Sequence, residues 1–142
     1  ESNILDLYSG TGSFGLECLS REAKNVYFVE SGKNAISVLK KNIDKLKLDK
    51  QTKIFFNDVF GLTKKEHMFK IKFDLIFCDP PFKDNNIEQL IDIVLNKNLL
   101  NESGIIILHR ERGKKDKFPD NFKIIEERIY GISKIIFGRF SA

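Results

Sequence analysis

Short apolar runs alternate along the chain with longer segments in which apolar residues recur at helical spacing. The short runs are rich in β-branched and aromatic residues and predict strands, whereas the spacing of Ile36, Leu39 and Ile43 predicts a helix. We expect strands at residues 3–8, 26–30, 53–57, 73–79 and 104–109, and helices at residues 15–21, 34–46 and 86–95. This alternation is typical of βαβ units and predicts an α/β fold, a three-layer sandwich around a mostly parallel sheet.

The pattern changes after the fifth expected strand. A charged stretch at residues 110–117 is followed by two β-rich segments, residues 122–130 and 133–140, with Gly131 and Ile132 between them. So short a connection predicts an antiparallel hairpin. A length of 142 residues fits a single domain over residues 1–142. Because Glu1 and Ser2 lead directly into the first strand, we expect that an N-terminal segment is lacking.

Composition narrows the class of protein. Hydrophobic residues make up 42% of the chain and charged residues 31%, which is typical of a soluble globular domain. No signal peptide and no apolar run of about 20 residues is visible, so we expect a cytoplasmic protein without membrane contact. Cys18 and Cys78 lie in apolar segments outside any CxxC motif, which predicts buried reduced thiols and no metal site. The net charge of +4 is compatible with a polyphosphate partner.

A glycine-rich turn joins the first strand to the first helix, with the sequence Ser9-Gly10-Thr11-Gly12-Ser13-Phe14-Gly15. Glycines in this context allow a tight turn and a close approach of the backbone to a nucleotide. Glu30 ends the second strand 20 residues after Gly10, where a carboxylate can accept hydrogen bonds from ribose hydroxyls. The pair predicts an adenosine-containing cofactor, either NAD or S-adenosylmethionine; the alternative is a glycine-rich connection without a ligand.

Two further strand ends separate these cofactors. Asp58 follows the third strand and could accept a hydrogen bond from an adenine amino group, with Val59 covering the ring; a polar strand cap is an equally good interpretation. The fourth strand ends in Asp79-Pro80-Pro81-Phe82. Two consecutive prolines remove two backbone donors, so the motif presents acceptors to a substrate that offers N–H groups, while Phe82 can stack on a ring.

With these motifs in place, the chain resembles the Rossmann-like methyltransferases, and most closely the bacterial family that methylates guanine N2 in 16S ribosomal RNA. Residues 4–17 are similar to that family's first motif, and residues 21–30 to its approach to the second strand. The resemblance implies a seven-stranded sheet whose seventh strand is antiparallel. It also implies S-adenosylmethionine as cofactor and 16S ribosomal RNA or an assembling small subunit as partner, and we expect a monomer.

The resemblance assigns roles to residues of this chain. The expected catalytic residues are Asp79, Pro80, Pro81 and Phe82, and the expected cofactor contacts are Asp6, Ser9, Gly10, Gly12, Glu30, Asp58 and Val59. The chain departs from the family at the end of the fifth strand, where an acidic residue is usual and Leu108-His109-Arg110-Glu111 stands instead.

Other interpretations remain open. If the protein were an NAD-dependent dehydrogenase, the Asp79-Pro80-Pro81-Phe82 motif would have no function in the reaction. Methylation of adenine N6 in DNA or of a protein glutamine amide would use a similar motif, and an RNA-binding or assembly module could keep the fold without activity. His67 and His109 are interpreted as structural residues, because no serine or cysteine motif accompanies them. Lys64, Lys65 and residues 110–117 are candidate phosphate contacts on loops.

Overall fold

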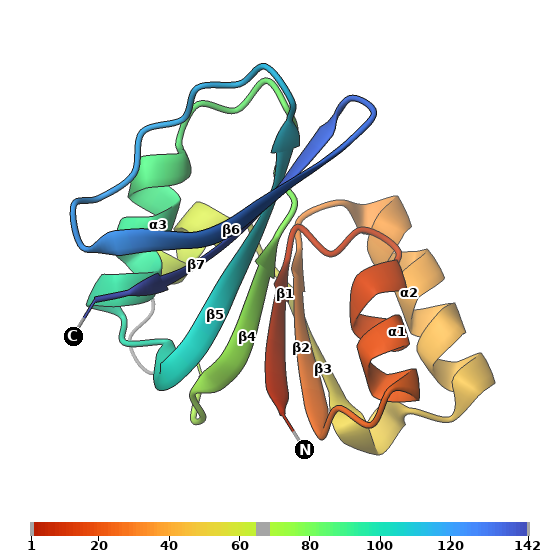
Figure 1. Cartoon of the computed structure of the whole chain (residues 1–142). Helices are drawn as coiled ribbons and strands as arrows, with labels where there is room; N and C mark the ends of the chain where they lie inside the picture. The colour runs from red at the N-terminus through yellow and green to blue at the C-terminus, as the bar shows by residue number, and fades with distance from the viewer. Residues whose placement is uncertain (1, 65–68, 142) are drawn as a thin grey trace.

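A computed structural model of the chain describes residues 2–64 and 69–141. Within these residues seven strands form one sheet in the order β3-β2-β1-β4-β5-β7-β6 (Figure 1). The strands are β1 (Asn3–Leu7), β2 (Asn25–Glu30), β3 (Thr52–Phe56), β4 (Phe73–Cys78), β5 (Leu100–Glu111), β6 (Phe122–Tyr130) and β7 (Ser133–Phe140). The helices are α1 (Ser13–Ser20), α2 (Lys33–Leu46) and α3 (Ile87–Asn96), with short 3₁₀ helices η1 (Asp49–Gln51) and η2 (Val59–Lys64).

The sheet topology confirms the expected fold class. Strands β1 to β5 pair in parallel, and β7 lies antiparallel between β5 and β6. The strand order reverses at β1, because the chain runs outward through β2 and β3 and then returns to β4 on the other side. The carboxyl ends of β1, β2 and β4 meet at this switch point, which is where parallel α/β sheets bind ligands.

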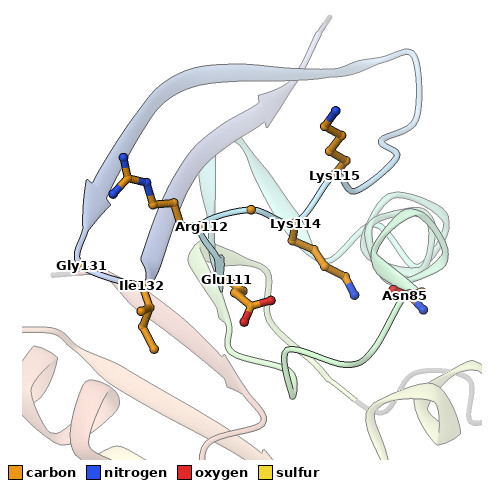
Figure 2. A pocket seen from close by; sticks show the side chains of 8 residues that line it. Asn85, Glu111, Arg112, Lys114, Lys115, Gly131 and Ile132 are labelled. Atoms are coloured by element: carbon orange, nitrogen blue, oxygen red, sulfur yellow. The ribbon is translucent and has the colours of Figure 1, made fainter.

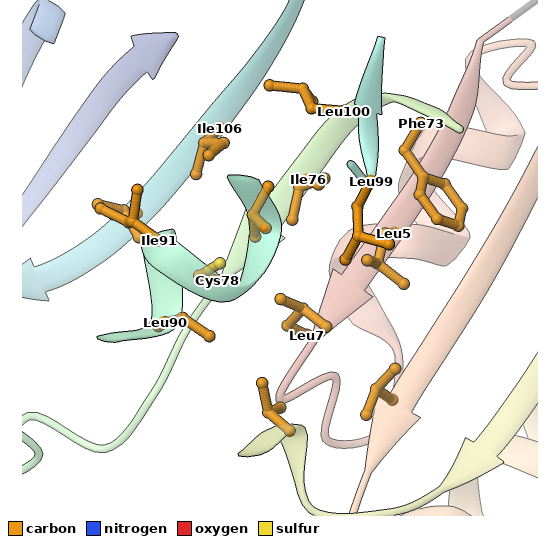
Figure 3. Packing of buried hydrophobic residues seen from close by; sticks show 14 of the residues in the cluster. Leu5, Leu7, Phe73, Ile76, Cys78, Leu90, Ile91, Leu99, Leu100 and Ile106 are labelled. Atoms are coloured by element: carbon orange, nitrogen blue, oxygen red, sulfur yellow. The ribbon is translucent and has the colours of Figure 1, made fainter. Parts of the chain in front are cut away.

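Two apolar layers cover the two faces of the sheet. On one face α1 and α2 pack on the sheet through Leu19, Leu39 and Ile43, and on the other face α3 and η2 bury a larger cluster with β1, β4 and β5 (Figures 1 and 3). Successive residues of β1 alternate between these layers, as a pleated strand requires. Both faces of the central strands are therefore buried, which holds their carboxyl ends in fixed positions.

The close packing of α1 depends on a glycine. A Cβ atom at Gly15 would lie 2.5 Å from the ring of Phe28 and 2.8 Å from Val26, so no side chain fits between the helix and β2. This contact lets the first turn of α1 approach the end of β1.

Strand β5 is the main difference from the expected elements. It begins at Leu100 rather than at residue 104 and ends at Glu111 rather than at residue 109. Its pairing with β4 shifts register between Phe73 and Leu75, and Asn101 Nδ2 donates to Asp74 Oδ1 (2.8 Å) beside the shift. The polar residues at this irregularity interrupt the apolar pattern, which is why the sequence predicts a shorter strand. The extension at the other end changes the role of Arg110.

The two cysteines differ from each other in burial. Cys78 is fully buried, as expected, whereas Cys18 is only half-buried, so the prediction of a buried thiol is wrong for Cys18. Burial raises the pKa of both thiols, that of Cys18 to about 11. Neither thiol is therefore activated as a nucleophile.

Across residues 2–64 and 69–141, no helix has both the length and the apolar character needed to cross a membrane. The same part of the chain contains no cluster of three or more histidine, cysteine, aspartate or glutamate side chains that could hold a metal ion.

Candidate active site

The glycine-rich turn leaves β1 through a run of left-handed backbone. Tyr8, Gly10 and Gly12 have φ angles of 59°, 58° and 90°, a region that glycine adopts without strain and a bulky residue such as tyrosine rarely adopts. A Cβ at Gly12 would overlap the Leu39 side chain, whereas a Cβ at Gly10 would meet nothing within 4 Å. Gly12 is thus required for packing, and Gly10 presents its backbone to open space.

Glu30 is held in place by the turn. Its Oε1 accepts a hydrogen bond from the Gly10 amide (2.7 Å), and its Oε2 accepts one from the Gly32 amide (2.8 Å). A carboxylate oxygen can accept two hydrogen bonds, so both oxygens keep capacity for a ligand. Glu30 and the neighbouring Ser31 line a pocket of about 580 Å³ at the end of the sheet. This geometry fits the two hydroxyls of a ribose.

Two buried polar atoms beside the turn lack a hydrogen-bond partner among the described residues, namely Asp6 Oδ1 and Ser9 Oγ. The other oxygen of Asp6 accepts from the Gly15 amide (3.2 Å). Burial raises the pKa of Asp6 to about 7, and the negative charges of Asp79 and Glu30 add to the effect. Orphaned polar atoms are rare in folded proteins, and both of these lie under the glycine turn, so the expected direct contact of Asp6 with a cofactor does not fit its 1% exposure.

The Asp79-Pro80-Pro81-Phe82 turn enters the same pocket from the end of β4. The Asp79 amide lies 3.5 Å from the Leu7 carbonyl oxygen, which ties this turn to the end of β1. Pro80 is buried, whereas Pro81 is exposed and Phe82 is half-buried. All four residues line the pocket together with Glu30, Ser31 and Asp58. The expected juxtaposition of cofactor and substrate motifs is therefore present in the fold.

His109 also belongs to this pocket, although the sequence analysis interpreted it as structural. Its Nδ1 lies 2.9 Å from Asp79 Oδ1, and its Nε2 lies 2.7 Å from the hydroxyl of Ser133. The Phe82 ring meets the imidazole edge to face, with 5.2 Å between ring centroids. Because adjacent parallel strands end side by side, the position of His109 near the end of the fifth strand is the signal that could have placed it next to Asp79.

The structure contradicts the predicted role of Arg110 as a phosphate contact on a loop. Its side chain is fully buried and pairs with Asp116 through Nε (2.8 Å) and Nη2 (3.0 Å). It also donates to the carbonyl oxygens of Pro81 (3.3 Å) and Asp84 (2.6 Å). Strand β5 continues to Glu111, so side-chain alternation turns Arg110 into the protein. Arg110 therefore braces the turn that follows Asp79.

Three other basic residues of this stretch line a separate groove beside the pocket, whereas Lys117 lines a different hollow. Arg112, Lys114 and Lys115 line an opening of about 860 Å³ together with Glu111, Asn85 and the turn at Gly131 and Ile132. Figure 2 shows how these residues lie. The groove adjoins the pocket, since Asp84 lines one and Asn85 the other. Of the other candidate contacts, Lys65 and His67 lie outside the described residues, as does the side chain of Lys64.

The structure separates Asp58 from Val59. Asp58 is exposed and lines the pocket, whereas Val59 is 2% exposed and packs in the core under η2. A side chain with so little accessible surface cannot cover an adenine ring, so the predicted role of Val59 does not fit this structure. The 3₁₀ helix that begins at Val59, which the sequence analysis did not predict, turns the side chain inward.

Sequence comparison identifies relatives over nearly the whole chain. Residues 1–139 match the family described as Conserved hypothetical protein 95. The ribosomal RNA small subunit methyltransferase D of Haemophilus influenzae is 35% identical over 132 residues, which are 93% of this chain and 68% of that protein. The protein of the same name from Buchnera aphidicola subsp. Baizongia pistaciae is 32% identical over 130 residues, 90% of this chain and 64% of that protein. The chain thus spans about two thirds of the length of these relatives.

Solved structures agree with the observed fold. The crystal structure of HI0767 from Haemophilus influenzae has a TM-score of 0.85 and 33% sequence identity, and the match covers 97% of this chain and 86% of that one. A more distant structure, SMU.776 complexed with SAH, has a TM-score of 0.76 and 18% identity over 96% of this chain and 44% of that one. The SAH in that structure belongs to SMU.776, and at this level of identity its likeness to the present chain is one of fold. The sequence of the chain is similar to those of the ribosomal RNA small subunit methyltransferase D proteins named above. The chain therefore belongs to the family described as Conserved hypothetical protein 95.

Proposed function

We propose that this chain is the catalytic domain of an S-adenosylmethionine-dependent methyltransferase that modifies the exocyclic N2 of a guanine in 16S ribosomal RNA. One observation carries the proposal: the acceptor-rich turn at Asp79 lines the same pocket as the carboxylate of Glu30, which we assign to the ribose. The names of the relatives support ribosomal RNA of the small subunit as the substrate class.

The cofactor end of the pocket is built from three strand ends. Glu30, fixed by two backbone amides, is assigned to the ribose hydroxyls, and Asp58 is assigned to the adenine amino group. The open backbone at Gly10 is assigned to the amino-acid end, whereas Asp6, which is 1% exposed, supports the turn from beneath through the Gly15 amide. S-adenosylmethionine supplies a methyl group on a positively charged sulfur, and the carboxylates at this end of the sheet favour that charge.

The substrate end explains why acceptors are needed. The lone pair of an exocyclic amine is delocalised into the base and becomes available only as the nitrogen turns pyramidal. Hydrogen bonds from the two N–H groups to the Asp79 carboxylate and the Pro80 carbonyl stabilise that geometry more in the transition state than in the ground state. Stacking on Phe82 contributes about 1–3 kcal/mol and sets the plane of the base.

Arg110 makes this turn rigid. Its hydrogen bonds to the carbonyls of Pro81 and Asp84 hold the chain just after the acceptors, and its own charge is balanced by Asp116. A fixed turn places the amine without reorganisation during the reaction, and such positioning accounts for much of the rate of group transfer.

The basic groove accounts for RNA binding. A guanine in folded RNA must turn out of its stack to enter the pocket, which costs a few kcal/mol. Arg112, Lys114 and Lys115 surround the groove next to the pocket, where they can contact the phosphates that flank the extruded nucleotide. Their contacts would offset the cost of extrusion.

The test uses the full-length protein with undermodified 16S ribosomal RNA, both naked and in small-subunit particles, and S-adenosylmethionine labelled in its methyl group. The proposal predicts label on N2 of one guanine, and loss of transfer but retained cofactor binding in Asp79→Ala. Label in adenine of DNA or in protein would reject the substrate, and calorimetric binding of NAD in place of S-adenosylmethionine would reject the reaction.

A further inference from the structure

We propose that His109, held by Ser133, is a positioning residue that sets the carboxylate of Asp79 to receive the target amine. The proposal rests on the function given above, because it concerns how the same pocket holds its main acceptor. It differs from that function in that neither the histidine nor the serine belongs to the Asp79-Pro80-Pro81-Phe82 motif.

Three strands contribute one residue each to this arrangement. Asp79 follows β4, His109 lies near the end of β5, and Ser133 begins β7. The distances of 2.9 Å from Asp79 Oδ1 to Nδ1 and 2.7 Å from Nε2 to the Ser133 hydroxyl are those of good hydrogen bonds. Both nitrogens of the imidazole are therefore engaged, and the ring cannot turn without losing both contacts.

Hydrogen-bond capacity sets the direction of each contact. The ionised carboxylate of Asp79 can only accept, so Nδ1 of His109 must carry the proton that it donates. In the neutral imidazole Nε2 is then an acceptor, and the Ser133 hydroxyl donates to it. The aspartate thus selects this tautomer, because the other one would set a lone pair of Nδ1 against the carboxylate, and the Ser133 hydroxyl, which can donate or accept, holds Nε2 in place.

The same order of groups occurs in serine hydrolases, where a buried aspartate orients the histidine that activates a serine. Here the exposure of the side chains indicates the opposite relation, in which the histidine orients the aspartate. Both residues line the pocket, but Asp79 is 43% exposed and His109 only 25%, so the carboxylate is the more accessible group. The histidine therefore acts on the aspartate, which is the group that faces substrate.

This contact gives the two oxygens of the Asp79 carboxylate different roles. Oδ1 of Asp79 already accepts one hydrogen bond from His109, which favours Oδ2 as the acceptor for an N–H of the target amine. The edge-to-face contact between His109 and Phe82 ties the base-stacking ring to the same imidazole. One histidine thus sets both the acceptor and the stacking platform of the substrate site.

Substitutions at His109 separate this role from simple packing. His109→Ala should lower kcat for methyl transfer about ten- to a hundredfold, the range expected for losing a hydrogen bond to a charged group. His109→Asn keeps a donor near the Nδ1 position and should recover much of kcat, whereas His109→Gln, whose amide reaches the Nε2 position, should not. S-adenosylmethionine binding, measured by calorimetry, should be unchanged in all three variants and shows that each is folded.

Substitution of Ser133 tests the remote part of the arrangement. Ser133→Ala should lower kcat about tenfold, and Ser133→Thr, which keeps the hydroxyl, should retain it. The matched control is Ser141→Ala, which removes a hydroxyl bonded to the Asn121 carbonyl beyond the other end of β7 and should have no effect. Equal loss of kcat in Ser133→Ala and Ser133→Thr would overturn the assigned role of the hydroxyl.

Nitrogen NMR of the imidazole tests the tautomer without any substrate. The chain has two histidines, so a His67→Gln variant assigns the signals. At mildly alkaline pH His109 should be the Nδ1–H tautomer in the wild-type protein and should lose that preference in Asp79→Ala, whereas Ser133→Ala should keep it. An Nε2–H tautomer in the wild-type protein would overturn the proposal.

The two proposals can fail separately. If the wild-type protein transfers methyl to guanine and Asp79→Ala is inactive, but His109→Ala and Ser133→Ala retain full kcat, the positioning role is wrong and the proposed function stands. If the wild-type protein methylates no ribosomal RNA, the proposed function fails, whatever tautomer the spectra show.

Discussion

Asp6 offers a test of how the pocket is charged, because its carboxyl group is almost completely buried. Burial raises its pKa from the ordinary value of 3.8 to about 7, and the hydrogen bond from the Gly15 amide, the one donor to this carboxyl group within residues 2–64 and 69–141, offsets only part of the effect. The replacement Asp6→Asn keeps the shape and an acceptor for that amide but cannot ionise. The variant therefore removes the titration of this carboxyl group and keeps its contact with the Gly15 amide.

The expected effect follows from linkage between protonation and folding. Between pH 3.8 and about pH 7 the folded protein keeps the proton that the unfolded chain has released, so the free energy of unfolding falls as pH rises through this window. The slope for one proton is about 1.4 kcal/mol per pH unit, which gives about 4 kcal/mol over the window. Above pH 7 the full penalty is present, and below pH 4 it is absent.

The assay is urea unfolding of wild-type protein and Asp6→Asn at intervals from pH 4 to pH 8, with the difference in unfolding free energy plotted against pH. We expect the two proteins to be similar near pH 4 and the variant to gain stability steadily, by about 4 kcal/mol, up to pH 7. The difference should then level off. If the difference in unfolding free energy stays constant from pH 4 to pH 8, burial does not hold the proton on Asp6.

Three further substitutions test the other parts of the site. Glu30→Gln should weaken S-adenosylmethionine binding at least about tenfold in calorimetry, because an amide cannot accept at both ends; an unchanged Kd would argue against the ribose contact. In urea unfolding, Arg110→Met should lower the free energy of unfolding by about 3–5 kcal/mol, because it leaves the buried charge of Asp116 unpaired. Adding Asp116→Leu should restore most of this free energy, and an Arg110→Met protein as stable as wild type would contradict the prediction. Lys114→Glu should raise KM for RNA and reduce its salt dependence, whereas Lys40→Glu on α2 should not, and equal effects of the two would remove the groove from the account.

Much of the site could be predicted because local patterns determine it. Gly10, Glu30 and Asp79 each follow an apolar strand, and parallel strands that end at one edge of a sheet bring such residues together. The reversal of strand order between β1 and β4 then determines which strand ends share a pocket. The terminal hairpin was also predictable, because Gly131 and Ile132 separate two β-rich segments.

The contacts that depend on long-range register were not predicted. His109 meets Ser133 only because β7 inserts between β5 and β6 and pairs antiparallel with β5. Arg110 becomes buried only because β5 runs on to Glu111 through a charged stretch that reads as a loop. Val59 turns into the core because a 3₁₀ helix begins there, and no periodic pattern marks so short an element.

The central claim is that the Asp79 turn faces the methyl-bearing sulfur across the pocket. A crystal structure of the full-length protein with S-adenosylhomocysteine measures this directly. The account predicts the ribose on Glu30 and the sulfur directed at the acceptors of Asp79 and Pro80, with room for one planar base against Phe82. A sulfur directed away from that turn would contradict it.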